Sequence, residues 1–595
     1  MSAAMIVKTI KSQEKGGGSR ENVSAPIGGS GGRVTTKWYD TKRGCVSIEV
    51  FIILLLIGVL YACHFMAIRY MPPTPPLQYV NVTTPCGVYI GIQQHNMYTF
   101  KGIRYAVLKA GLANNESAQP VWGNAAWCNP HDVHKSLNFG KPCLQMLRTV
   151  AEDGFATDQE ILYGCKDCLF SNIFVPSNIL NINTSGTGVI VYVHGGEMRQ
   201  GSGHQEDIVP LSAIAARFVQ DMGVLLVTFN YRLILHQSQG PIKQAHDVLS
   251  GSGVADQIEL LRWVNKMIPY FGGNKDNVTL LVHDHKDSLI HQIEEKAGGS
   301  LFTRAIVLSP IITETSDYPI STTSDRTATR ELSRTNDHEQ FGSNCSQETC
   351  EWKPRGSLES HSGDWFEASM CSPESQKSHK LLLASPDSEL QYKNQNKIDT
   401  LILLPRQSLD YCVPPELRLG RMDLSTLNGL IKNLLCNKPG VQNCSHVAKL
   451  ALDIYLEDNH DSCFYDKIWA NILSDMHHLC PVLNRFCPTN KTECEKFVVI
   501  LEKEDTMAYK PMANKNYYAF YASKRWDLIS LFGMHEIYFR EATDLDVKNT
   551  GQLNERLKQF LNNSTEVEKD NLMLQKLRNL RSNCKFWQKL LSEKH

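Results

Sequence analysis

Two short turns carry the residues of this chain that are best suited to chemistry. One is His194-Gly195-Gly196-Glu197, which follows the apolar run VIVYV, and the other is Val282-His283-Asp284-His285-Lys286, which follows the apolar run VTLLV. Glycines let backbone N–H groups approach a substrate and stabilise a developing negative charge. A carboxylate such as Asp284 can attack carbon, and a histidine can activate water. The two turns therefore suit hydrolytic chemistry.

The same histidines also suggest a metal site. Alternate residues on a strand share a face, but residues at a turn need not. The sequence offers no third ligand beside His283 and His285, so we expect these rings to be hydrogen-bonded or exposed. We expect the chain to hold no metal and no cofactor.

Strands and helices must alternate to position these turns. Continuous apolar runs at 189–193, 224–233, 278–282 and 305–310 read as buried strands, and helical sequence lies between them. This pattern predicts a mostly parallel central sheet with helices on both faces. YYAFYA at 517–522, late in the chain, also reads as a strand.

A long apolar run precedes this domain. VFIILLLIGVLYACHFMAI, from Val50 to Ile68, is long enough to span a bilayer at about 1.5 Å per residue. Basic residues are concentrated before it, at Lys8, Lys11, Lys15, Arg20, Arg33, Lys37, Lys42 and Arg43, and only Arg69 follows closely. By the positive-inside rule, this asymmetry predicts a single-pass type II protein of the plasma membrane with its C-terminal domain outside the cell.

The predicted organisation has four parts. Residues 1–45 are a disordered cytoplasmic tail, 46–69 the transmembrane helix, 70–80 a proline-rich stalk, and 81–595 the extracellular domain. Within that domain we expect a polar insertion at about 311–375 and C-terminal helices at about 551–592.

Cysteines and glycosylation sequons agree with an extracellular domain. Of the 18 cysteines, Cys45 and Cys63 lie before or within the span, which leaves an even number beyond it. Sequons occur beyond the span at Asn81, Asn115, Asn183, Asn277, Asn344, Asn443, Asn490, Asn562 and Asn563. Lys plus Arg number 61 and Asp plus Glu 62, so the balance of charge gives no general attraction to nucleic acid.

A series of short motifs resembles the type-B carboxylesterase and cholinesterase family. They occur in order as Phe100–Ala106, Cys143–Gln145, Cys165–Leu169, His194–Gly196, Asn230–Leu233, Asp256–Val264, Phe271–Asn274, Val278–Thr279 and Leu301–Ile306. The resemblance covers about residues 80–310 and is faint afterwards. It implies an α/β-hydrolase fold, in which the second turn is the nucleophile elbow.

The chain departs from the family pattern at the positions that carry catalysis. The family serine falls on Asp284, with Val282 and Lys286 in place of the flanking glycines. A glycine of the oxyanion segment falls on Glu197, the catalytic histidine on Gly533, and the acid on Ser408. His535 lies two residues from the histidine position.

The resemblance also implies disulfides and an assembly. It pairs Cys143 with Cys168 and, in a short later loop, Cys345 with Cys350. Cys436 and Cys444 could close another local loop, but pairing cannot be deduced from sequence. Family members often dimerise through C-terminal helices; here Leu557, Phe560 and Leu561 lie at helical spacing, and packing on the chain's own domain is equally possible.

These departures lead to an expectation about function. Similar non-catalytic members of the family, such as neurotactin, gliotactin and the neuroligins, imply a protein that is not an enzyme and acts in adhesion or as a receptor through extracellular protein partners. The alternative is a membrane-anchored hydrolase with altered chemistry, in which Asp284 is the nucleophile and His535 activates water.

Overall fold

The computed structural model divides into two units, Met1–Pro76 and Leu77–His595. It describes residues 51–61, 77–94, 96–108, 120–121, 128–150, 156–179, 186–196, 198–206, 209–234, 246–285, 289–297, 301–311, 398–413, 417, 421–436, 443–457, 464–487, 497–503, 521–522, 526–533, 544–562 and 571–592. The polar insertion at 311–375 lies almost wholly outside these residues. Of the predicted stalk, 70–76 lies outside them, whereas 77–80 is described and belongs to the second unit, with Gln78–Val80 in its first strand.

The first unit contributes one described element. Residues 51–61 are helical and expose large apolar side chains, including Leu54 and Leu60. Among all the residues that the structure describes, no helix is long and apolar enough to cross a membrane. The predicted span of 46–69 extends past the described helix on both sides and stays a prediction.

The second unit is built on an 11-stranded sheet. Its order is β1-β2-β3-β9-β13-β10-β14-β15-β16-β17, with β6 beside β2. The strands are β1 (Gln78–Thr84), β2 (Gly87–Gln94), β3 (Met97–Arg104), β6 (Val133–Lys135), β9 (Phe170–Pro176), β13 (Leu225–Phe229), β10 (Thr187–Val193), β14 (Gly273–His283), β15 (Arg304–Leu308), β16 (Asp399–Pro405) and β17 (Val498–Leu501).

The sheet is mixed, and its two halves differ in direction. From β1 to β13 each neighbour along the order is antiparallel. From β13 to β17 all neighbours are parallel. The strands of the parallel half are nearly continuous buried apolar runs, as expected for strands covered on both faces. The predicted strands at the two chemical turns, β10 and β14, are adjacent and pair Val193 with Val282.

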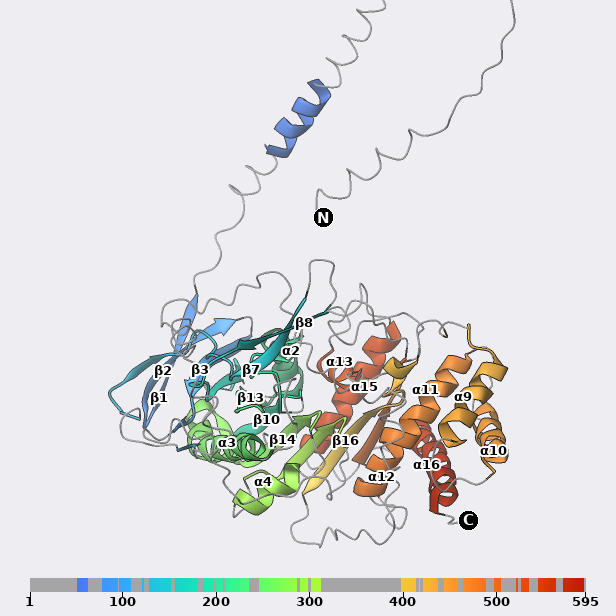
Figure 1. The fold of residues 1–595 in the computed structure, drawn as a ribbon. Helices are drawn as coiled ribbons and strands as arrows, with labels where there is room; N and C mark the ends of the chain where they lie inside the picture. The colour runs from blue at the N-terminus through green and yellow to red at the C-terminus, as the bar shows by residue number, and fades with distance from the viewer. Residues whose placement is uncertain are drawn as a thin grey trace, which may run out of the picture. The chain divides into compact units, whose positions relative to one another are not determined.

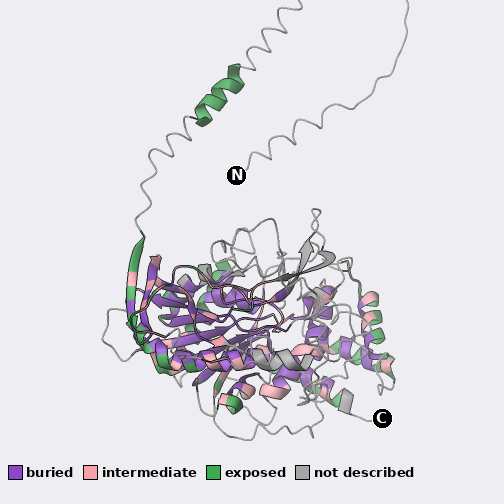
Figure 2. Ribbon diagram, turned by 60° about the vertical axis from the view of Figure 1, so that its left-hand side comes forward, coloured by how far each residue is buried: buried purple, intermediate pink, exposed green. Residues whose placement is uncertain are grey.

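Helices cover both faces of this sheet (Figure 1). Alternate strand residues point to opposite faces, so Val191 and Leu280 pack with α3 (His246–Met267), whereas Ile190 and Leu281 pack with α2 (Leu211–Met222). The strands between the helices form the buried interior of the domain (Figure 2). The prediction of a mostly parallel sheet between helical layers is confirmed for the half that holds the two turns.

A second group of helices extends the first layer over β16 and β17. It comprises α9 (Leu424–Cys436), α10 (Cys444–Glu457), α11 (Tyr465–Ser474), a π-helical turn η6 (Asp475–Leu479), α12 (Cys480–Phe486) and α16 (Asn571–Ser592). On the other face lie α13 (Trp526–Phe532) and α15 (Asp544–Leu561).

The side chains expected at a dimer interface lie inside this domain. Leu557, Phe560 and Leu561 of α15 are buried in the cluster formed with α2 and α13. A dimer through the C-terminal helices stays a prediction, and it would have to use other faces of them.

Candidate active site

The elbow lies where β14 ends. Asp284 is the first residue after the strand and has a φ of 51°, in the left-handed region that side chains rarely adopt. Aspartate tolerates this conformation better than most residues. Its backbone N–H donates to the carbonyl of Leu308 at 3.0 Å, which ties the turn to the end of β15. The side chain is buried, with a relative exposure of 5%. Asp284 therefore occupies the strained strand-to-helix turn that presents a nucleophile in this fold.

The two elbow histidines have different surroundings. His285 Nε2 lies 3.1 Å from the Tyr231 hydroxyl and 2.9 Å from the His194 carbonyl oxygen. The Tyr231 hydroxyl also donates to that carbonyl at 2.7 Å, and its ring stacks on the His194 imidazole. His285, Tyr231 and His194 thus form a buried hydrogen-bonded group, which joins the elbow to the glycine turn after β10.

His283 faces a buried carboxylate instead. Its Nε2 lies 3.9 Å from Asp527 Oδ1, and Ser309 donates to Asp527 Oδ2 at 2.7 Å. Burial raises the pKa of Asp527, the nearby His283 and the Ser309 hydrogen bond lower it, and the Asp284 carboxylate raises it. The net shift is upward, so Asp527 keeps its proton to higher pH than an exposed carboxylate.

The glycine turn is held by a buried glutamine. Gln145 accepts from the Gly201 N–H at 3.0 Å through Oε1 and donates to the Gly201 carbonyl at 3.2 Å through Nε2. Gly201 has a φ of 105°, and a Cβ there would lie 2.5 Å from His194 Nδ1. Gln145, the last residue of the Cys143–Gln145 motif, therefore fixes the loop that follows the glycine turn.

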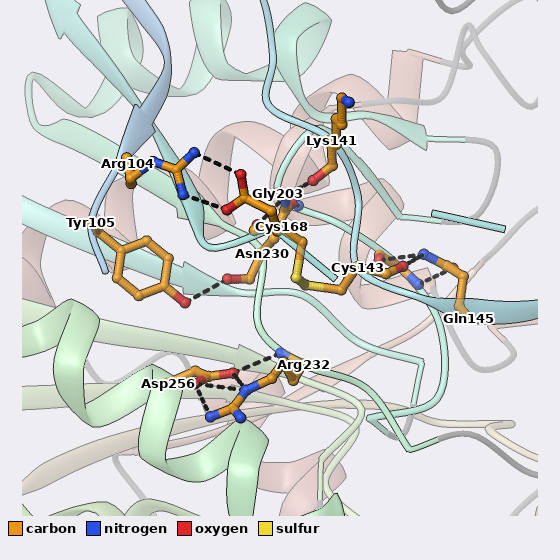
Figure 3. The surroundings of a disulfide bond; sticks show 12 residues. Arg104, Tyr105, Lys141, Cys143, Gln145, Cys168, Gly203, Asn230, Arg232 and Asp256 are labelled. Atoms are coloured by element: carbon orange, nitrogen blue, oxygen red, sulfur yellow. Dashed lines mark hydrogen bonds and ion pairs between the residues drawn. A yellow bond between two sulfur atoms is a disulfide. The ribbon is translucent and has the colours of Figure 1, made fainter. Parts of the chain in front are cut away.

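Asn230 is the second anchor of this region (Figure 3). Its Nδ2 donates to the carbonyls of Lys141 and Cys168, and its Oδ1 accepts from the Gly203 N–H at 2.7 Å. Its own carbonyl accepts from the Tyr105 hydroxyl at 2.7 Å. One side chain thus holds three separate loops beside the Cys143–Cys168 disulfide.

A buried ion pair supports the same region from below (Figure 3). Arg232, after β13, donates to Asp256 of α3 from Nε at 2.8 Å and from Nη2 at 2.6 Å. The Arg232 backbone N–H donates to the same carboxylate at 2.9 Å. The motif residues Asn230, Arg232 and Asp256 thus position the site rather than take part in its chemistry.

Ser408 and Gly533 stand at the positions of the acid and the histidine in the family pattern. Ser408 lies after β16, where its hydroxyl is 2.8 Å from His478 Nδ1 of η6. Gly533 ends α13 with a φ of 63°, a conformation that suits glycine. Strands β14, β15 and β16 are parallel neighbours, so Asp284, Ser309 and Ser408 follow their carboxyl ends at one edge of the sheet. That edge is where ligands bind in open α/β sheets.

Several predicted site residues lie outside the described residues. These are Glu197, Lys286, His535, Cys345, Cys350 and the sequon asparagines Asn115, Asn183, Asn344, Asn490 and Asn563. Of the remaining sequons, Asn81, Asn443 and Asn562 are exposed, whereas Asn277 is half-buried and accepts from Arg304 at 2.7 Å. Glycosylation at these positions stays a prediction.

The described disulfides reach beyond those that the motifs implied. Cys143 pairs with Cys168, as the resemblance implied, and Cys436 with Cys444. Cys86–Cys128 and Cys480–Cys584 are additional, and the second joins residues 104 apart. Within the described ranges, no group of three or more His, Cys, Asp or Glu side chains is placed to hold a metal ion.

Sequence patterns gave no indication of His478, Asp527 or the Arg406–Asp475 ion pair. No motif marks them, because each meets its partner only through the fold. The pair of histidines His477-His478 was a weak compositional signal. The order of the strands, the elbow at Asp284 and the glycine turn beside it define an α/β hydrolase.

The chain belongs to the carboxylesterase family, which it matches over residues 78–594. It is similar to a carboxylic ester hydrolase of Bombus ignitus, with 32% identity over 33% of this chain and 33% of that protein. It is also similar to the human bile salt-activated lipase, with 30% identity over 32% of this chain and 23% of the lipase. These alignments span no more than about a third of the relatives' length.

Solved structures agree with the fold. An esterase from the anaerobe Clostridium hathewayi superimposes with a TM-score of 0.50 and 18% sequence identity, covering 82% of this chain and 90% of that one. At this identity the likeness shows the α/β-hydrolase fold alone.

These comparisons contradict one prediction from the sequence. The chain was expected not to be an enzyme, because family residues are replaced at Asp284, Gly533, Ser408 and Glu197. The matched relatives and structures are ester hydrolases, lipases and esterases. Replacement of a serine does not establish loss of chemistry, since a carboxylate held at the elbow is itself a possible nucleophile. The adhesion subgroup is likewise not what these matches identify.

Proposed function

We propose that this chain hydrolyses carboxylic esters, with the Asp284 carboxylate as nucleophile. The backbone of Asp284 carries the proposal: it is a non-glycine residue at a φ of 51°, directly after β14, with its N–H fixed to Leu308. Such strain is retained where the surrounding structure enforces it, and it is concentrated at functional sites. The family of the chain favours ester hydrolysis over other reactions.

The reaction takes place in two steps. An oxygen of the Asp284 carboxylate bonds to the alkyl carbon of the ester, and the bond between that carbon and the ester oxygen breaks, releasing the acid as its carboxylate. Water then attacks Cγ of the resulting aspartyl ester, releases the alcohol and restores the carboxylate. The first step needs no proton transfer, and the second is the step that a histidine accelerates.

Asp527 is a second buried carboxylate, and its charge acts on the elbow. Asp527 lies close enough for the two carboxylates to repel each other. Burial raises the pKa of Asp527, so this residue takes up a proton more readily than an exposed aspartate. A proton on Asp527 removes the like charge that would otherwise oppose a negative Asp284.

The test uses the purified full-length chain and short acyl esters. The Asp284→Asn variant and its control are made in a chain that also carries Ser408→Ala, because Ser408 has a hydroxyl in contact with a histidine at this edge. We expect turnover in the Ser408→Ala chain and a loss of about a thousandfold or more when Asp284→Asn is added, since removing a nucleophile is among the largest single effects known. Asp276→Asn is the matched control, because Asp276 is an exposed carboxylate on the same strand. Turnover that is equal in the two variants would rule out Asp284 as nucleophile.

A second candidate function is adhesion or signalling through extracellular protein partners. Disulfides favour it, because Cys86–Cys128, Cys143–Cys168, Cys436–Cys444 and Cys480–Cys584 suit an oxidising compartment. We propose with it a type II plasma-membrane protein whose C-terminal domain is outside the cell. The basic flank before the apolar run and the sequons after it support that orientation. This role does not depend on whether the domain also turns over esters.

Cell aggregation tests this second candidate. Cells that express the full-length chain should bind each other or cells that carry a protein partner, and protease treatment of the partner cells should abolish the binding. Absence of binding to every cell type offered, with the chain detected at the surface, would remove the support for adhesion. Surface labelling of intact cells tests the orientation separately.

A further inference from the structure

Ser408 and His478 form a hydrogen-bonded pair at the same edge of the sheet as the elbow. Ser408 Oγ lies 2.8 Å from His478 Nδ1, and His478 Nε2 lies 3.0 Å from the carbonyl oxygen of Pro310. A carbonyl oxygen can only accept, so Nε2 carries the proton and Nδ1 is the acceptor for the Ser408 hydroxyl. This is the direction of hydrogen bonding that a serine nucleophile and its base require.

The loop that carries Ser408 is fixed to the helix that carries His478. Four successive residues contact that helix, and Ser408 is the third. Arg406 pairs with Asp475 at 2.6 Å, Gln407 donates to Asn471 at 2.9 Å, and the Leu409 N–H donates to Ser474 Oγ at 3.0 Å. Residues on both sides of Ser408 are therefore held, which fixes the geometry of the pair before any ligand binds.

The histidine lies on an unusual turn. Asp475–Leu479 is a π-helical turn between α11 and α12. Such turns are rare, and proteins keep them disproportionately at functional sites. The turn is anchored at its first residue by the Arg406 ion pair and at its fourth by the Pro310 carbonyl. The His478 ring is therefore oriented from two neighbouring strands, β15 and β16.

We propose that Ser408 and His478 are a second nucleophile–base pair, which accepts the acyl group of small esters. The pair combines a hydroxyl, a base in hydrogen-bond contact and a third group that orients the base. Ser408 is buried and His478 is half-buried. Because a buried hydroxyl excludes bulky groups, we take small acyl esters as the substrate class. This inference does not rest on Asp284.

The chemistry is that of an acyl transfer. Ser408 Oγ bonds to the carbonyl carbon of the ester while its proton passes to His478 Nδ1. The bond between that carbon and the alkoxy oxygen then breaks, and the proton on His478 goes to the departing alcohol. Water repeats the sequence on the acyl-serine, with His478 taking and returning the proton, so the acid is released and Ser408 is restored.

A fluorophosphonate probe tests the proposal directly, because it bonds to activated serines. The full-length chain is labelled, digested and mapped by mass spectrometry. We expect the label on the peptide that contains Ser408, no label there in Ser408→Ala, and a labelling rate about 100-fold or more lower in His478→Ala. Added imidazole should restore part of the rate in His478→Ala but not in Ser408→Ala. The control is Ser425→Ala, which removes an exposed hydroxyl on α9.

A cysteine variant tests the pair without removing the nucleophile. Ser408→Cys keeps a nucleophile of similar size, and it should react with a thiol reagent faster than the same variant with His478→Ala added. The proposal is overturned if the folded, unchanged chain carries no probe at Ser408, or if labelling is the same with and without His478. Loss of labelling at Ser408 in a chain whose turnover still requires Asp284 would overturn this inference alone.

Discussion

Two buried ion pairs invite comparison, because each fixes the chain where it leaves a parallel strand. Arg232 follows β13 and binds Asp256 of α3, and Arg406 follows β16 and binds Asp475 of η6. Both aspartates are wholly buried. The first pair lies in the half of the domain in which family motifs are evident, and the second lies beyond residue 310, where they are faint.

The surroundings of the two pairs differ. Burial raises the pKa of both aspartates, and the arginine opposes that shift in each case. Asp475 also accepts from Tyr455 at 2.6 Å and from Asn583 at 3.3 Å, so its contacts reach α10 and the C-terminal helix α16. The second half therefore uses one carboxylate to join elements that lie far apart in the sequence.

Removal of the Cys480–Cys584 disulfide should have the largest effect on stability. This disulfide closes a separation of 104 residues, whereas Cys143–Cys168 closes 25. Loop-closure entropy predicts a loss of about 4.7 kcal/mol for the first and about 3.5 kcal/mol for the second. Urea unfolding of the two double alanine variants measures both. A larger loss of unfolding free energy on removing Cys143–Cys168 would show that strain or packing, rather than chain entropy, sets the difference between the two variants.

Removing the aspartate of either ion pair should lower the free energy of unfolding slightly less than removing the Cys480–Cys584 disulfide does. Asp475→Ala and Asp256→Ala each leave a buried arginine without its partner, for an expected loss of about 4 kcal/mol. The loss should be greater for Asp475→Ala, which also removes the acceptor of Tyr455 and Asn583. The matched control is the double variant Arg406→Met with Asp475→Leu, which should recover much of the stability. Losses under 1 kcal/mol would contradict the importance given to these pairs.

A pH effect is expected in the first half of the domain. Burial lowers the pKa of His204 from 6.5 to about 4. The folded chain therefore resists protonation that the unfolded chain accepts. The stabilisation is fully present above pH 6.5 and declines by about 1.4 kcal/mol for each pH unit as the pH falls towards 4. Unfolding measured across that window should lose this slope in His204→Phe. An unchanged slope would show that other groups cause it.

The smallest effect concerns the start of α9 in the second half. The pKa of exposed Asp423 is lowered, first by hydrogen bonds from Thr426, whose N–H donates to it at 2.7 Å, and then by Ser425. Because the pKa of Asp423 is lower in the folded chain, its carboxylate stabilises the fold at pH values above its ordinary pKa of 3.8. This stabilisation is lost as the pH falls through the pKa of the folded state. Asp423→Ala should be slightly destabilised at pH 7, with no difference from the unchanged chain in strong acid. Asp423→Asn, which keeps a capping oxygen, should lose less.

The sequence predicted the parallel half of the sheet and the place of the elbow because their signals are local. Asn230 and Gln145 each hydrogen-bond a backbone group beside the glycine turn, and each lies within one of the short motifs. The signal weakens where contacts become long-range. Arg406 and Asp475 are 69 residues apart, and no spacing rule joins them.

The late strand illustrates the same limit. YYAFYA was expected to form it, but residues 517–520 lie outside the part of the chain that the structure describes, so that strand stays a prediction. The described strand beside β16 is β17, Val498–Leu501, which the sequence did not mark. A run as short as VVIL becomes a strand through pairing with β16, which sequence periodicity does not reveal. Site chemistry was harder still to predict, since His478 and Asp527 reach Ser408 and His283 only after the helices pack on the sheet.

Isotope incorporation in a single turnover tests the proposed elbow chemistry most directly. The full-length chain in excess over a short acyl ester is allowed one turnover in water enriched in ¹⁸O. The same measurement is made with Ser408→Ala, so that acyl transfer to Ser408 cannot label the acid. If the carboxylate of Asp284 is the nucleophile, one ¹⁸O atom appears in the peptide containing Asp284 and the acid released by Ser408→Ala stays unlabelled. Label in the released acid with none in Asp284 would contradict the account at the elbow.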